Sequence, residues 1–260
     1  MTEKFNSLVV LLLLLSCSVY SKNLNDTALS IKYYDYDIVI STDADGYFTG
    51  KLGTYKEGKE LFNMDSSFTN YIDHNLIDLD NDGNNELLLY LSEGASPYIF
   101  HVLFIFDHNK GASPLFYIQN GELDTSDAGR PLIVVNNRLS PAILGLWYSY
   151  YLEYNDGRIS YHKPEKWRSA KLAADFEMLD DIFKEVNSNK QDCGDYGYNV
   201  FFEYLFLCSK LAGDEVKAEK YFYEKYKCDD KTSALKSFKE YASDNLSWIK
   251  DENNYKFTEY

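Results

Sequence analysis

The sequence predicts an α+β protein in which an N-terminal antiparallel β-rich domain is followed by a C-terminal helical bundle. Two observations support this. Short strand-like runs separated by turn signals recur between residues 33 and 162, and past Pro164 the apolar residues take up a helical period. Strands spaced roughly 8 to 12 residues apart, without helices between them, are typical of antiparallel sheets. We expect a signal peptide over residues 1–21, a β-rich domain over 22–163 and a helical domain over 164–260.

The first segment has the pattern of an export signal. Lys4 precedes an apolar run from Leu8 to Leu15, which is too short to cross a hydrocarbon core of about 30 Å as a helix. Two kinds of processing are open. Val19-Tyr20-Ser21 suits ordinary signal peptidase, whereas Leu14-Leu15-Ser16-Cys17 resembles a bacterial lipobox, in which Cys17 would be lipidated. We therefore expect an exported protein without a transmembrane span that is periplasmic, secreted or anchored to the outer membrane as a lipoprotein.

The net charge and aromatic content of the chain limit the kinds of molecule that it is expected to bind. The formal net charge is −15, so the chain is repelled by nucleic acid and by anionic lipid, whereas calcium or a basic protein would be attracted. The 24 Tyr and 16 Phe residues indicate a well-filled core rather than disorder, and exposed tyrosines can also stack on sugars. A protein or a glycan is the expected partner.

The β-rich region divides at its turn signals. Asp-Gly and Asn-Asp-Gly sequences are typical of hairpin turns, and several lie between apolar runs. Gly-Ala-Ser-Pro occurs twice before such a run, which agrees with stacked hairpins or a partial propeller. The expected strands are 37–41, 47–52, 71–77, 87–91, 102–106, 115–118, 147–154 and 158–162.

The most specific motif is the nine-residue loop Asp78-Leu-Asp80-Asn-Asp82-Gly83-Asn84-Asn-Glu86. Carboxylates at positions 1, 3, 5 and 9 can point toward one centre, Gly at position 6 permits a positive φ, and the carbonyl of Asn84 adds another oxygen. Calcium takes six to eight oxygen ligands in flexible geometry, so the loop predicts a calcium site. A polar hairpin turn remains the alternative. His74, four residues before Asp78, is close enough to touch the cation loop but is expected to be an ordinary strand or turn residue.

The loop resembles the calcium loops of FG-GAP (VCBS-type) repeats, which form the blades of integrin-like propellers. The acid that closes the loop is at position 9 and an apolar strand follows at once, unlike an EF-hand, whose closing Glu is at position 12. The resemblance implies that Asp78, Asp80, Asp82, Asn84 and Glu86 ligate the ion. It covers some twenty residues, no Phe-Gly precedes the loop, and the chain has one such loop, so an intact seven-bladed propeller is not expected.

The C-terminal region shows helical periodicity. The segment from Tyr198 to Leu211 is apolar nearly all round and predicts a central, buried helix. Gly213 should end it, and Asp214 is placed to cap the next helix. The flanking helices are expected over 172–186, 216–222 and 235–249. The spacing of the apolar and small residues around Gly213 also resembles a single tetratricopeptide repeat. Because a solenoid of such repeats needs about three units, a plain helical bundle is predicted.

The cysteines predict one disulfide bond. If the helices before and after Gly213 are antiparallel, Cys193 and Cys228 return to the same end of the hairpin and should pair in an oxidising compartment. Cys208, inside the apolar helix, should remain a buried thiol. The alternative is that all three stay reduced.

No catalytic motif is legible. Ser96 and Ser113 lack the Gly-x-Ser-x-Gly elbow, no phosphate-binding glycine loop is present, and the four histidines are scattered. Three functions remain: an exported, non-catalytic protein in which calcium stiffens a β-domain used for binding; a periplasmic immunity or inhibitor protein against a secreted toxin or cell-wall hydrolase; and a hydrolase whose acids cannot be singled out. The first is preferred, and no enzyme activity is expected.

Overall fold

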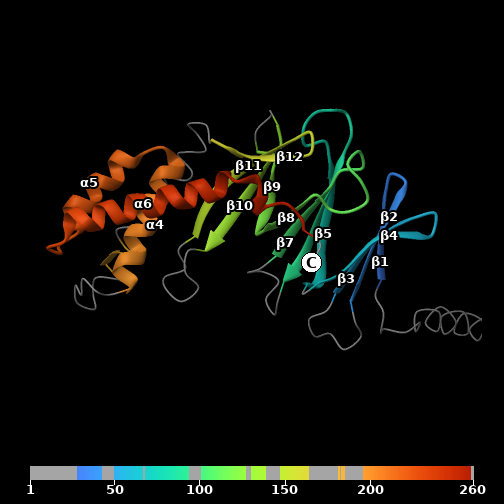
Figure 1. Cartoon of the computed structure of the whole chain (residues 1–260), viewed down its shortest axis with the longest axis horizontal. Coiled ribbons are helices and arrows are strands. Elements are labelled where there is room, and N and C mark those ends of the chain that lie inside the picture. Colours follow the sequence, from blue (N-terminus) through green and yellow to red (C-terminus); the bar gives the residue numbers. More distant parts are fainter. Residues whose placement is uncertain are drawn as a thin grey trace, which may run out of the picture.

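The computed structural model describes residues 28–42, 50–66, 68–93, 101–126, 130–138, 147–163, 181, 183–184 and 196–258. Within these ranges, twelve strands form three antiparallel four-stranded sheets, and three helices follow them (Figure 1). The predicted α+β class, with β structure first and helices last, is confirmed. The expected signal segment, the Cys17 lipidation site, Cys193 and nearly all of the helix expected over 172–186 lie outside the described residues.

Each sheet contains four strands that are consecutive in the chain. The first sheet contains β1 (Ala28–Tyr33), β2 (Tyr36–Thr42), β3 (Gly50–Lys56) and β4 (Lys59–Ser66). The middle sheet contains β5 (Phe68–Ile77), β6 (Glu86–Glu93), β7 (His101–Phe106) and β8 (Phe116–Gln119). The third sheet contains β9 (Gly121–Asp124), β10 (Leu132–Arg138), β11 (Trp147–Asn155) and β12 (Arg158–His162). A four-stranded antiparallel sheet is also the unit of a propeller blade, in agreement with the expected stacked hairpins or partial propeller.

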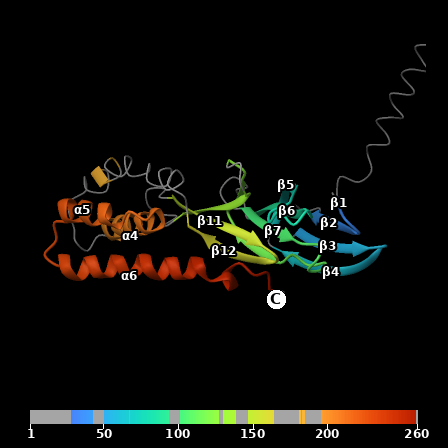
Figure 2. The ribbon, with the colours of Figure 1, turned by 90° about the horizontal axis from the view of Figure 1, so that it is seen from above.

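The middle sheet is buried on both faces. Along β6, Leu87 and Leu89 pack against the first sheet, whereas Leu88 and Tyr90 point to the opposite side and join the core shared with the third sheet and the helices. Because successive side chains of a strand point to opposite faces, a strand covered on both sides must be apolar at consecutive positions. This explains why β6 and β7 contain unbroken apolar runs, and Figure 2 shows the middle sheet between the other two.

The helices are α4 (Tyr196–Ala212), α5 (Glu215–Lys225) and α6 (Lys231–Lys250). α4 packs against both others, and its side chains are buried almost all round, as its sequence predicted. Gly213 follows α4 with φ +74°, and the Asp214 N–H donates to Ser209 O at 2.8 Å, so the helix ends as expected. Asp214 does occupy the N-cap position of α5, but its side chain makes no capping hydrogen bond.

The C-terminal segment connects the helices to the sheets. After α6 and a short 3-10 helix (Glu252–Asn254), the chain lies beside β8: the Tyr117 N–H donates to Tyr255 O at 2.8 Å, and the Phe257 N–H donates to Leu115 O at 2.9 Å. The Phe257 ring packs edge-on against Phe62 and Phe104. One continuous buried cluster also extends from the middle and third sheets into α4, α5 and α6. The β-rich and helical regions therefore share a core.

The cysteine chemistry agrees with part of the prediction. Cys228 is buried and disulfide-bonded, whereas Cys208 is a buried thiol outside any disulfide. Cys17 and Cys193 lie outside the described residues, so the pairing of Cys193 with Cys228 stays a prediction. Among the described helices, none is long and apolar enough to span a membrane.

Candidate metal centre

The loop from Asp78 to Glu86 connects β5 to β6. Ile77 pairs with Glu86 across the two strands, and the pairing is regular from there back to Asp73, so the loop closes tightly. The reversal needs two positive φ angles, +60° at Asn81 and +90° at Gly83. A Cβ at Gly83 would meet nothing within 4 Å, so glycine is favoured there by its backbone conformation and not by lack of space.

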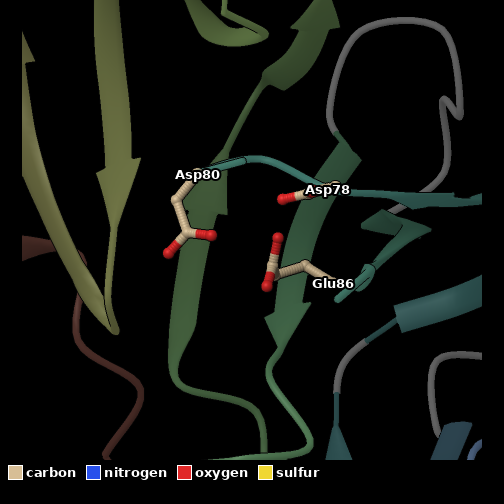
Figure 3. Close-up of side chains that lie close together, drawn as sticks. All are labelled: Asp78, Asp80 and Glu86. Carbon is tan, nitrogen blue, oxygen red and sulfur yellow. The ribbon is translucent and has the colours of Figure 1, made fainter. Parts of the chain in front are cut away.

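Three of the predicted ligands lie together. Asp78, Asp80 and Glu86 each offer a carboxylate oxygen, and these atoms all lie within 4.8 Å of one another (Figure 3). Two oxygens bound to the same calcium ion at roughly 2.3–2.6 Å can be separated by at most about 5 Å, so this spacing fits a shared cation. We call these three residues the carboxylate triad.

The other two predicted ligands are not part of the carboxylate triad. The Asp82 carboxylate accepts hydrogen bonds from the Asn84 N–H at 2.7 Å and from the Asn84 side-chain amide at 3.2 Å. The Asp82 N–H in turn donates to Asp78 Oδ1 at 3.1 Å, and the Gly83 N–H donates to Asp78 Oδ2 at 2.9 Å. Asp82 therefore stabilises the turn, and its backbone N–H helps to orient the carboxylate triad.

All three sheets contact the loop. From the first sheet, the Tyr33 hydroxyl donates to Asn85 O at 3.0 Å, and the Tyr34 hydroxyl accepts from the Asn85 N–H at 2.9 Å. From the third sheet, the Asp156 N–H in the β11–β12 turn donates to Asp80 Oδ2 at 2.7 Å. The carboxylate triad thus lies where the three sheets meet, and its geometry affects their packing.

Glu86 is the buried member of the carboxylate triad, with only 1% of its surface exposed. Burial raises the pKa of Glu86 to about 7, and the negative charges of Asp80, Asp107 and Asp82 act in the same direction. The Leu79 N–H donates to Glu86 Oε2 at 2.8 Å and opposes part of this shift. The ionised form of Glu86 therefore has no nearby positive charge that offsets the cost of its burial.

No positive side chain in the described part of the chain forms an ion pair with the carboxylate triad. The basic side chains nearby are engaged elsewhere: Lys110 pairs with Asp156 at 2.6 Å, and Arg130 pairs with Glu153 and donates to Leu79 O at 3.1 Å. A buried carboxylate is costly to ionise without a compensating cation. An oxygen-liganded metal ion suits this set of donors better than a protein cation does.

Sequence reasoning missed a second buried acid close to the loop. Asp107 is 4% exposed, and its Oδ2 accepts a hydrogen bond of 2.6 Å from the Tyr154 hydroxyl. Its charge raises the pKa values of both Glu86 and Tyr154. The available signal was that Asp107 directly follows the apolar run of β7, just as Asp78 directly follows β5. His74 lies in β5 and hydrogen-bonds to Tyr71, as expected of a strand residue.

Comparison with known proteins adds no relative: no family model matches the chain, and neither a curated protein nor a solved structure is similar to it.

Proposed function

We propose that the protein is an exported, non-catalytic binding protein whose stacked sheets are stiffened by a calcium ion at Asp78, Asp80 and Glu86. The observation that carries this proposal is the carboxylate triad itself. Three carboxylate oxygens lie within 4.8 Å of one another, one of the groups is almost completely buried, and no described basic side chain pairs with them. The partner bound by the sheets is expected to be a protein or a glycan.

Calcium fits better than magnesium. The donors are all oxygen atoms. Calcium accepts irregular cages of six to eight oxygens, whereas magnesium demands a near-octahedral site at about 2.0–2.1 Å. Water, the Asn84 carbonyl and the Asp82 carboxylate are available to complete the shell. For Asp82 to bind the ion, its carboxylate would use a lone pair that the Asn84 N–H and side-chain amide leave free.

The role of the ion is structural in this proposal. Tyr33 and Tyr34 hold the loop from the first sheet and Asp156 holds it from the third, so neutralising the carboxylate triad would strengthen contacts among all three sheets. The hydrolase alternative would need an acid that reaches substrate. Glu86 has a raised pKa, as a general acid would, but it is nearly inaccessible and its Oε2 is occupied by the Leu79 N–H.

Thermal melting and titration calorimetry test the proposal, with millimolar calcium, magnesium or chelator. Asp80→Asn removes one charge of the carboxylate triad. Asp65→Asn is the matched control, because Asp65 is an exposed acid on β4 that forms only a 3.8 Å surface ion pair with Lys51. Calcium should raise the Tm of the wild type and of the control by several degrees, and that of Asp80→Asn by far less. If the wild type has the same Tm in calcium and in chelator, and calorimetry detects no heat of binding, the loop is an acidic turn and not a calcium site.

A further inference from the structure

A second acidic feature lies elsewhere on the middle sheet. A cavity of about 460 Å³ opens where β9 of the third sheet lies against β5, β6 and β7. It is lined by Asp73 and Asn75 of β5 and by Glu122 of β9, among others. Asp73 lies in β5 and precedes Asp78, the first residue after that strand, by five residues. This is about 16 Å along an extended chain, so the cavity is separate from the carboxylate triad.

The base of the cavity is polar. Tyr90 is 8% exposed, and burial raises its pKa to about 12, although the nearby Leu123 backbone and Asn75 side chain act to lower it. His101 Nε2 lies 3.2 Å from Gly121 O, so an N–H on that nitrogen donates to the carbonyl. These groups give the cavity a polar base that contains no lysine or arginine.

The rim carries two carboxylates. Asp73 and Glu122 are both exposed, and both raise the pKa of the Tyr90 phenol, which places their charges around the same hydroxyl. No Lys or Arg forms an ion pair with either of them in the residues that the structure describes. The apolar side chains Ile72, 43% exposed, and Leu123 complete the lining. The cavity therefore combines a negative rim with an accessible apolar wall.

We propose that this cavity binds an arginine side chain presented by a basic partner protein. The guanidinium group would lie between the carboxylates of Asp73 and Glu122, and the aliphatic stem would pack on Ile72 and Leu123. Charge complementarity supports this occupant, because the described lining of the cavity contains two acids and no lysine or arginine, and the whole protein has a net charge of −15.

Arginine suits the cavity better than lysine does. The guanidinium is planar, offers five N–H donors and is weakly hydrated, so it can engage two separated carboxylates while its faces contact apolar groups. Lysine has a compact, strongly hydrated charge that would satisfy one carboxylate at a time. This inference goes beyond the proposed calcium site and uses different residues, so either can fail without the other.

The test uses three short synthetic peptides with the same sequence except for one central arginine, lysine or citrulline, titrated into the full chain by NMR and calorimetry. We expect saturable binding of the arginine peptide, weaker binding of the lysine peptide, and no binding of the neutral citrulline peptide. The double variant D73N/E122Q should weaken arginine binding at least tenfold, and Asp65→Asn should not. Because all three acids are exposed, the variants should fold normally, as thermal melting would verify.

Chelator separates this proposal from the calcium site. Arginine binding should persist in chelator, whereas the melting shift attributed to calcium should not. Equal binding of the citrulline and arginine peptides would overturn the inference, as would equal losses in D73N/E122Q and Asp65→Asn, which would indicate only nonspecific attraction. Binding of a neutral oligosaccharide at Tyr90, with no binding of the arginine peptide, would assign the cavity to a glycan and would also overturn it.

Discussion

The core of the helical region and the junction of the three sheets are stabilised by different physics. Around Phe202 the core is almost wholly aromatic, with the rings of Phe222, Tyr226 and Phe238 within 6 Å of its centroid. At the junction, Glu86 and Asp107 place carboxylates where water is excluded. Apolar burial does not depend on ions or on proton concentration near neutrality, whereas buried carboxylates do. Calcium and pH should therefore act on the sheet junction and leave the helical core unchanged.

The largest expected effect is on the aromatic core. Phe202→Ala removes a fully buried ring and should lower the free energy of unfolding by roughly 3–5 kcal/mol. Chemical denaturation measures this, and the loss should be the same in calcium and in chelator. A loss that depends on calcium would contradict the separation between the two regions.

The next largest effect concerns the disulfide bond of Cys228. If its partner is Cys193, the bond closes a loop of about 35 residues, and Cys228→Ser should cost roughly 3–4 kcal/mol in the chain-entropy model. Mass mapping under non-reducing conditions should recover a Cys193–Cys228 peptide pair. Cys208→Ser leaves the cross-link intact, so its cost should be smaller, and a Cys208 linkage in solution would mean that the helices are arranged differently.

The smallest of the three effects is a dependence on pH at the sheet junction. The folded-state pKa of Glu86 is about 7, above the ordinary value of 4.5, so without a cation the folded protein retains a proton that the unfolded chain releases. In chelator, the free energy of unfolding should fall as pH rises from about 4.5 to 7, by on the order of 2–3 kcal/mol.

Glu86→Gln tests the origin of that loss. The amide has no proton to release in this range, so the decline in stability between these pH values should be largely absent in chelator, and the response to calcium should be lost. Denaturant titrations at several pH values measure both. The same decline in wild type and Glu86→Gln would assign the pH dependence to other groups, Asp107 being the first to examine.

Sequence reasoning succeeded where the information was local. The all-round apolar character of α4 predicted its burial, and the run from Leu87 to Leu91 predicted a strand. The register of Asp78, Asp80 and Glu86 indicated three oxygens that the structure does bring together. The pairing of Tyr255–Phe257 with β8 was not predictable, since it depends on a sheet edge more than a hundred residues away. The burial of Asp107 was missed because it depends on contacts with residues far away in the sequence, among them Tyr154 of the third sheet, whose hydroxyl donates to Asp107.

Residue-resolved hydrogen exchange tests the central claim most directly, because one experiment measures the amide exchange rates of both the sheet junction and the helical core. The amides of Asn85 and Asp156, which join the loop to the first and third sheets, should exchange markedly more slowly in millimolar calcium than in chelator. The amides of Phe202 and Leu205 in α4 should change little. Equal exchange at Asn85 and Asp156 with and without calcium, or a uniform change across α4 as well, would contradict a cation that stiffens the junction of the three sheets.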